Sequence, residues 1–142
     1  MRDETKASLV EMLERQEGYR QYPYKCPAGY WTVGIGRNLE ANGIDHNEAI
    51  MLLDSDITKC ESELLRAWPE FMNLNEARQV VVLNMCFQMG VAGFMMFTST
   101  RRHMEAQECS DASEHMLDSR WHSQTPSRCE ELALIMATGE LP

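Results

Sequence analysis

The chain has 142 residues, of which 44% are hydrophobic and 25% charged, enough for one globular domain with its own core. Its 13 basic and 22 acidic residues give a formal net charge of −9. That charge argues against nucleic acid as a partner, because phosphate binding needs clustered lysine and arginine. No apolar run approaches the roughly 20 residues that span a bilayer, so we expect no membrane insertion.

The N-terminal stretch "MRDETKASLVEMLERQEG" is too charged for a secretory signal and predicts the start of a helix. We therefore expect a chain made in the cytoplasm, with reduced thiols. The five cysteines are odd in number and form no CxxC motif. A loose C-terminal group of possible metal ligands matches no zinc spacing: His103, Cys109, His115, His122 and Cys129. The sequence predicts no metal and no cofactor.

In chain order, apolar residues at helical spacing predict a first helix from Glu4 to Glu17, stopped by Gly18. Aromatic and β-branched residues on both sides of "CPAG" predict a hairpin. Residues 37–44 allow a short third strand. These elements predict a small β lobe over about residues 18–44.

The remaining elements are helical. Asp45 and Glu48 fit a capping box that begins a long helix closed by Pro69. Asn75 can cap a nearly all-apolar helix ending at Gly90, expected to be the buried centre of a helical lobe. Two shorter helices follow, in "FTSTRRHMEAQE" and "DASEHMLDSRW". Thr125 and Pro126 are a cap and first residue for a last helix to about Thr138.

This layout predicts an α+β fold that is mostly helical. We expect a single domain over residues 1–142, with the small antiparallel lobe, a helical lobe over about residues 70–140 that includes the N-terminal helix, and a cleft between the lobes.

Three polar residues stand around the hairpin, and each has an ordinary interpretation. Glu17 can be a solvated residue at a helix end. The helix's negative end and the nearby Tyr19, Tyr22, Tyr24, Tyr30 and Trp31 would instead favour the uncharged acid by repulsion and by shielding from water. Cys26 can be a small turn residue, or a thiolate favoured by its position after a lysine. Thr32 can be a common strand residue.

Read together, these residues resemble a known family. The order Glu17, Cys26, Thr32 within "EGYRQYPYKCPAGYWTVGIGRNL" resembles the phage-type lysozymes, endolysins that cut peptidoglycan. "LNMCFQMG" at residues 83–90 is similar to the family's central-helix signature, and "SRWHSQTPSR" at 119–128 to its C-terminal signature. The resemblance covers roughly residues 8–140.

The chain departs from the family pattern in four ways. Cys26 stands where the family usually has aspartate, and Arg37 where it often has histidine. The segment between Leu39 and Asp45 is short, which predicts a compact sheet lobe. The acidic net charge is also unusual for such lysozymes.

The resemblance implies hydrolysis of the β-1,4 bond between N-acetylmuramic acid and N-acetylglucosamine. Glu17 would be the general acid, and Cys26 with Thr32 would position and activate a water on the opposite sugar face, giving inversion. In the competing mechanism, Cys26 is a nucleophile and the configuration is retained. A thiol is a weaker resident anion than a carboxylate at neutral pH.

The resemblance also implies substrate-binding roles for Phe87, Gln88 and Arg120, with packing against the core as the alternative for Phe87. Of Arg120 and Arg128, one would support the cleft and the other brace helices. Trp121 is expected in the core. The apolar stripe of the central helix is expected there too: Val80, Val81, Leu83 and Met85.

The implied biology is lysis of the host at the end of phage infection. The partners would be bacterial peptidoglycan and, indirectly, a holin-type membrane protein that releases a monomeric enzyme from the cytoplasm to the wall. Two alternatives stay open: a catalytically weak or inactive glycan-binding or virion module of the same fold, and a lytic transglycosylase. Hydrolysis, which needs a positioned water, fits Thr32 and the polar Cys26 better than transglycosylation.

Overall fold

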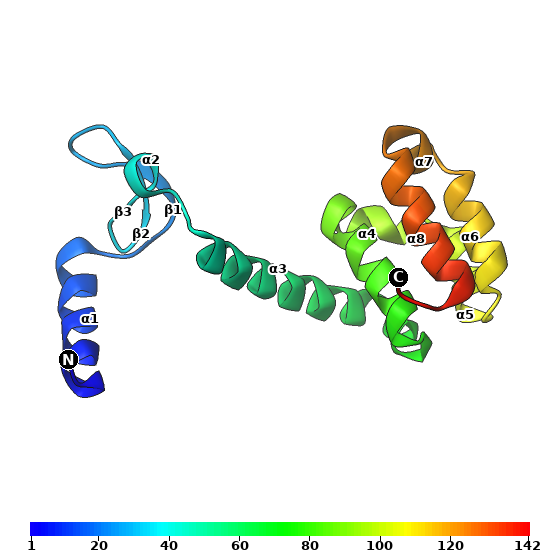
Figure 1. The fold of residues 1–142 in the computed structure, drawn as a ribbon, viewed down its shortest axis with the longest axis horizontal. Helices are drawn as coiled ribbons and strands as arrows, with labels where there is room; N and C mark the ends of the chain where they lie inside the picture. Colours follow the sequence, from blue (N-terminus) through cyan, green and yellow to red (C-terminus); the bar gives the residue numbers. More distant parts are fainter. The chain divides into compact units, whose positions relative to one another are not determined.

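The computed structural model describes all residues from Met1 to Pro142 (Figure 1). The elements are α1 (Asp3–Glu17), β1 (Arg20–Lys25), β2 (Trp31–Gly34), β3 (Arg37–Asn38), α2 (Leu39–Asn42), α3 (His46–Ala67), the 3-10 helix η1 (Pro69–Asn73), α4 (Glu76–Met95), α5 (Thr98–Glu105), α6 (Cys109–Leu117), α7 (Arg120–Gln124) and α8 (Pro126–Thr138). A mostly helical chain with one small antiparallel sheet confirms the predicted fold class.

The chain divides into two compact units, Met1–Met51 and Leu52–Pro142. The first holds α1, the sheet, α2 and the start of α3; the second holds the rest of α3 and all later helices. The predicted place of α1 in the helical lobe stays a prediction. No single helix is long and apolar enough to cross a membrane, although α4 and α5, bent by 100°, would pass as a pair on length and composition.

The sheet of the first unit has the order β1-β2-β3 with both pairs antiparallel. Tyr24 pairs with Thr32, and Thr32 pairs with Asn38, so these three residues form a row across the sheet. The third strand is only two residues long, because the Asn38 side chain accepts a hydrogen bond from the Ala41 amide and thereby begins α2.

Polar contacts of β3 fix the entry into α3. Asp45 and Glu48 form the predicted capping box, with Asp45 Oδ1 accepting from the Glu48 amide at 2.9 Å and Glu48 Oε1 accepting from the Asp45 amide at 3.4 Å. Arg37 pairs with Glu48 at 2.8 Å and donates to the Gly43 carbonyl at 3.1 Å. Arg37 therefore ties the sheet to the start of α3.

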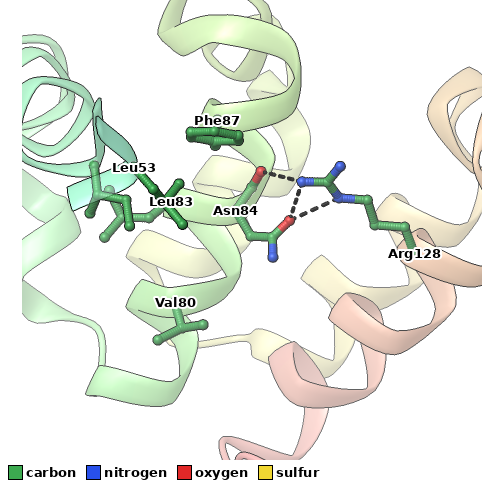
Figure 2. A pocket seen from close by; sticks show the side chains of 7 residues that line it. Leu53, Val80, Leu83, Asn84, Phe87 and Arg128 are labelled. Atoms are coloured by element: carbon green, nitrogen blue, oxygen red, sulfur yellow. Dashed lines mark hydrogen bonds between the residues drawn. The ribbon is translucent and has the colours of Figure 1, made fainter. Parts of the chain in front are cut away.

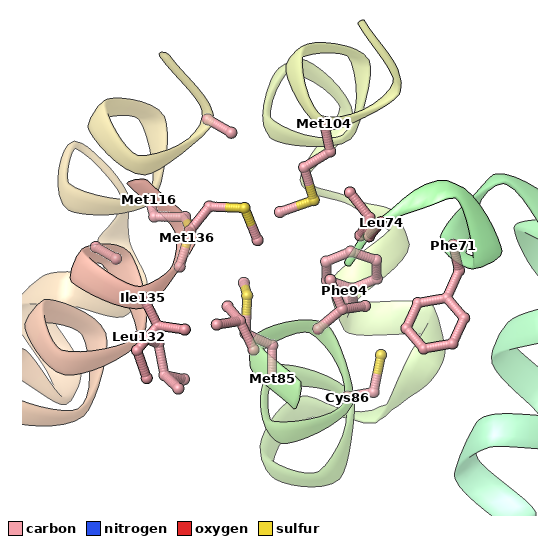
Figure 3. Packing of buried hydrophobic residues seen from close by; sticks show 14 of the residues in the cluster. Phe71, Leu74, Met85, Cys86, Phe94, Met104, Met116, Leu132, Ile135 and Met136 are labelled. Atoms are coloured by element: carbon pink, nitrogen blue, oxygen red, sulfur yellow. The ribbon is translucent and has the colours of Figure 1, made fainter. Parts of the chain in front are cut away.

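The apolar core lies in the second unit, where methionine is prominent among the side chains that α4, α5, α6 and α8 bury (Figure 3). The fully buried large residues are Trp68, Phe71, Phe94, Leu64, Met85, Met104, Met116, Met136, Val81, Val82 and Cys129. Truncating one of the larger of these, a leucine, methionine or aromatic residue, to alanine costs about 2–5 kcal/mol, so these side chains account for much of this unit's stability.

Helix α4 departs from its predicted form in two ways. Asn75 caps it as expected, through the Arg78 amide, but the helix resumes after Gly90, where φ is +78° and the axis kinks. Val81 and Met85 are buried, whereas Val80 is 43% exposed and Leu83 only half-buried. The expected buried stripe was wrong for Val80, because the second unit packs against one face of α4 only.

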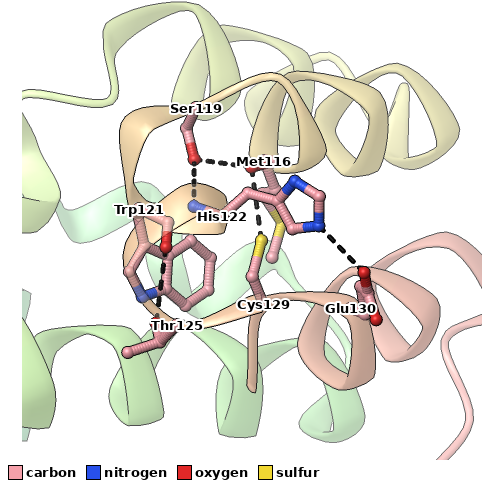
Figure 4. Close-up of polar contacts among 7 residues, drawn as sticks. All are labelled: Met116, Ser119, Trp121, His122, Thr125, Cys129 and Glu130. Atoms are coloured by element: carbon pink, nitrogen blue, oxygen red, sulfur yellow. Dashed lines mark hydrogen bonds and ion pairs between the residues drawn. The ribbon is translucent and has the colours of Figure 1, made fainter. Parts of the chain in front are cut away.

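The C-terminal signature also differs from its prediction (Figure 4). The helix expected over "DASEHMLDSRW" is two helices, because Ser119 Oγ donates to the Met116 carbonyl at 2.6 Å and accepts from the His122 amide at 3.3 Å, which begins α7. Pro126 opens α8 as predicted, but Thr125 is no side-chain cap: its hydroxyl donates back to the Trp121 carbonyl at 3.4 Å. Gly139 ends α8 with φ +74°, as expected.

Candidate active site

A cavity of about 300 Å³ in the first unit brings together the end of α1, the hairpin turn and the row of residues across the sheet. Its lining consists of Glu17, Arg20, Tyr24, Cys26, Pro27, Thr32, Gly36 and Asn38. The three residues predicted to carry the chemistry therefore share one cavity, although 15 positions separate the first from the last (32 − 17).

Glu17 is the last residue of α1, and its exposed carboxylate lies against Gly36. A Cβ placed on Gly36 would lie 3.1 Å from Glu17 Oε2. The φ of Gly36 is +68°, in the left-handed region that favours glycine. Gly36 thus permits the close approach of the sheet's backbone to the carboxylate, for both steric and conformational reasons.

Cys26 opens the hairpin turn. Its amide donates to the Tyr30 carbonyl at 2.9 Å, and its carbonyl accepts from the Gly29 amide at 2.8 Å, closing a four-residue turn with Gly29 at φ +87°. The turn directs backbone hydrogen-bond donors at the sulfur. Hydrogen bonds from the backbone of Tyr30, then of Ala28, together with the Thr32 hydroxyl, lower the pKa of the Cys26 thiol against the opposing effect of desolvation.

Thr32 is the most buried member of the set, at 4% exposure. Its hydroxyl donates to the Tyr30 carbonyl at 2.9 Å. A hydroxyl whose hydrogen is engaged in this way turns its lone pairs to other neighbours, so Thr32 Oγ1 can accept a hydrogen bond from a water molecule. The same hydrogen can turn toward Cys26 when the sulfur is a thiolate.

Three further lining residues, Arg20, Gly36 and Asn38, escaped the sequence analysis, whereas Tyr24 was expected there only as a shield of Glu17 and Pro27 only as part of the turn. The Arg20 guanidinium lies 4.2 Å from the centre of the Tyr24 ring, which places a cation at the cavity. Alternation along a strand places residues 20 and 24 on one face and was the available signal. The pairing register shifts between Arg20 and Tyr24, however, and the sequence does not reveal this shift.

The aromatic residues expected to shield Glu17 do not do so as a group. Tyr24 lines the cavity, whereas the other four are 46–73% exposed: Tyr19, Tyr22, Tyr30 and Trp31. Trp31 neighbours Thr32 in β2, so its side chain leaves the opposite face of the sheet. There it lies near the Lys25 ammonium, 5.3 Å from the ring centre.

A second cavity, of about 330 Å³, lies in the second unit (Figure 2). It is lined by Leu53, Ile57, Val80, Leu83, Asn84, Phe87 and Arg128. Phe87, a predicted substrate-binding residue, is 50% exposed beside it. Arg128 donates two hydrogen bonds to Asn84 Oδ1, from Nε at 2.9 Å and from Nη2 at 2.6 Å. This polar pair borders an otherwise apolar surface.

The other two predicted substrate-binding residues differ from each other. Gln88 Oε1 accepts from the Trp121 indole at 2.9 Å, and its amide nitrogen donates to Thr125 Oγ1 at 3.4 Å. Trp121 is 5% exposed, which confirms its place in the core. Arg120 is exposed at the start of α7. Of the two arginines of the signature, Arg128 is the one that lines a cavity.

The remaining cysteines differ from Cys26. All five thiols are free. Burial raises the pKa of Cys86 to about 12 and that of Cys129 to about 11, and it also raises the pKa of the half-buried Cys60. Cys109 is buried. Cys26 is thus the cysteine with a lowered pKa.

Comparison with known proteins gives matches along nearly the whole chain. The family model described as phage lysozyme matches residues 14–133. The probable T4-type lysozyme 1 of Dictyostelium discoideum is 29% identical over 95% of this chain and 96% of its own. The pre-baseplate central spike protein Gp5 of Enterobacteria phage T4 is also 29% identical, over 98% of this chain but 29% of its own. The peptidoglycan hydrolase gp36 of Pseudomonas phage phiKMV is 26% identical, over 88% of this chain and 14% of its own.

Proposed function

We propose that this chain, which belongs to the phage lysozyme family, hydrolyses the β-1,4 bond between N-acetylmuramic acid and N-acetylglucosamine in peptidoglycan. The observation that carries the proposal is the single cavity of the first unit. It holds a carboxyl group, a thiol with a lowered pKa and a buried hydroxyl, which are the groups that acid-assisted attack by water needs.

Glu17 is the general acid of the proposed reaction. Its proton passes to the glycosidic oxygen as the bond from that oxygen to the anomeric carbon breaks. Gly36 leaves room for the Glu17 side chain, which lines the cavity. The turn after α1 begins at Gly18, whose amide donates to the Glu14 carbonyl at 2.8 Å. Glu17 is thereby held at a defined helix end.

Cys26 and Thr32 position the attacking water. Thr32 Oγ1 donates its own hydrogen to the Tyr30 carbonyl or to the Cys26 thiolate, and it accepts one hydrogen of the water. The Cys26 sulfur accepts the other and, as a thiolate, takes that proton as the water oxygen bonds to the anomeric carbon. Because the water attacks the face opposite the leaving oxygen, the product has inverted configuration.

The substrate and the biology of the reaction belong to the same proposal. Phe87, Gln88 and Arg120 contribute to glycan binding, in line with the apolar and polar groups that sugar sites combine. The enzyme acts on the bacterial wall at the end of phage infection, as a monomer released from the host cytoplasm through a holin-type membrane protein.

Product analysis tests the reaction. Purified peptidoglycan digested by the wild type should yield reducing muramic acid ends by mass spectrometry, with the inverted anomer formed first in the NMR spectrum. An end lacking one water would indicate a transglycosylase, and initial retention would make Cys26 a nucleophile. No release of fragments would indicate a glycan-binding module.

Substitution of Cys26 tests the role of the thiol. Cys26→Asp should keep or raise activity, because a carboxylate is fully ionised at neutral pH. Cys26→Ala should lower activity by about 10²-fold or more, the usual contribution of a general base. Equal rates for Cys26→Ala and the wild type would exclude any role of the thiol in the reaction.

A further inference from the structure

A group of side chains that can ligate a metal lies where α5 meets α6, outside both cavities described above. His103 Nδ1 lies 3.2 Å from Glu108 Oε2, and one ligand atom from each of His103, Glu108 and Asp111 lies within 4.8 Å of the others. The ring of His115 is stacked on that of His103, with 4.8 Å between ring centres. We propose that His103, Glu108 and Asp111 form a binding site for a divalent transition metal ion such as Zn²⁺, with the His115 ring stacked beside it.

The distances suit such an ion. Two ligands bonded to zinc at 2.0–2.2 Å in a tetrahedral site lie about 3.3–3.6 Å apart. The His103–Glu108 pair already has about that separation, at 3.2 Å. Asp111 has to approach by at most roughly 1.3 Å, the difference between 4.8 and about 3.5 Å, and its side chain is exposed.

Backbone hydrogen bonds between α5 and α6 hold these residues in defined positions. The Glu108 amide donates to the His103 carbonyl at 2.8 Å and the Gln107 amide to the Met104 carbonyl at 3.0 Å, the paired bonds of a Schellman turn. Asp111 and His115 stand four residues apart on α6, so they share one face of that helix. Beneath them, Met104 and Ala112 are fully buried.

The ligand types and the local charge select the ion. Imidazole with carboxylate suits zinc and its neighbours in the transition series, whereas calcium and magnesium take oxygen ligands alone. The segment from 108 to 118 carries four acidic residues and no lysine or arginine: Glu108, Asp111, Glu114 and Asp118. On binding, the metal takes the place of the hydrogen between His103 Nδ1 and Glu108, and the ring hydrogen moves to Nε2.

The test is a titration of the full chain with Zn²⁺, followed by calorimetry and by the imidazole nitrogen signals in the NMR spectrum, with the thiols kept reduced. We expect one ion to shift the signals of His103 and His115 before those of His46 and His122. Binding at Cys26 alone, with no shift of His103, would overturn the proposal.

Variants locate the site independently. His103→Ala and the milder Asp111→Asn should each weaken Zn²⁺ binding by at least about tenfold. His122→Ala is the matched control, because His122 forms a similar pair with Glu130, at 3.0 Å, but is not part of a group of three ligands. Equal affinity in Asp111→Asn and wild type, or a loss of the same size in His122→Ala, would refute the proposal whatever the lytic activity.

Discussion

Gly36→Ala, compared with a control glycine, separates two reasons why the structure has a glycine at this position. The first is conformational: a φ of +68° costs an alanine about 1–2 kcal/mol. In a chain of this length, that loss lowers the melting temperature by roughly 3–8 °C. The second is steric, because the new Cβ would lie 3.1 Å from Glu17 Oε2, closer than ordinary contact.

The carboxylate relieves that contact by moving a few tenths of an ångström, since it ends a flexible side chain. Misplacing a catalytic group by 1 Å can cost about 10²-fold, so this smaller shift should lower kcat by about four- to tenfold. Gly34→Ala is the matched control: φ is +65° in the same sheet, with nothing within 4 Å of its Cβ.

The assay compares the initial rate of turbidity loss of permeabilised Gram-negative cells with the melting temperature from circular dichroism for both variants. We expect similar losses of stability but a lower rate for Gly36→Ala alone. If the two variants lose equal activity, the contact with Glu17 has no part in placing the acid.

Three other predictions follow from the same contacts. Iodoacetamide at neutral pH should label Cys26 before the other four cysteines, and peptide mass mapping that finds Cys60 or Cys86 labelled first would contradict this. The labelling rate of Cys26 should rise with pH through a midpoint below that of free cysteine, because the lowered pKa keeps the thiolate populated at lower pH. Gln107→Gly should raise the free energy of unfolding by about 0.5–1 kcal/mol in urea titrations, because Gln107 has a φ of +59° at a helix end. An unchanged or lower free energy of unfolding would mean that the backbone at Gln107 carries no strain. Moderate salt should speed lysis by screening the net charge of −9 from an anionic wall over about 8–10 Å, whereas a steady loss from the lowest salt upward would exclude that repulsion.

The elements of the fold were largely predictable because their signals are local. Gly18 and Gly139 end helices, the Asp45–Glu48 box begins one, and "CPAG" turns the hairpin. The predictions failed where tertiary packing decides. Val80 belongs to the same apolar run as Val81, and only the packing of the second unit leaves one exposed and buries the other.

The candidate site was predictable only for residues whose chemistry or motif stands out. Glu17, Cys26 and Thr32 share the family spacing, and the structure brings them to one cavity. The role of Gly36 could not be predicted, because it depends on the approach of a helix end to the sheet. Asp111 likewise lies near His103 only because of the Schellman turn between α5 and α6, and its ligand atom is within 4.8 Å of that of His103.

The most direct test of the proposed function is the rate of wall lysis by Glu17→Gln against that of Glu14→Gln. Both changes remove one acid from exposed positions of α1, but only Glu17 lines the cavity. The proposed mechanism predicts that Glu17→Gln keeps its fold and loses lysis by at least about 10²-fold, while Glu14→Gln lyses cells like the wild type. Full lysis by a folded Glu17→Gln variant would contradict it.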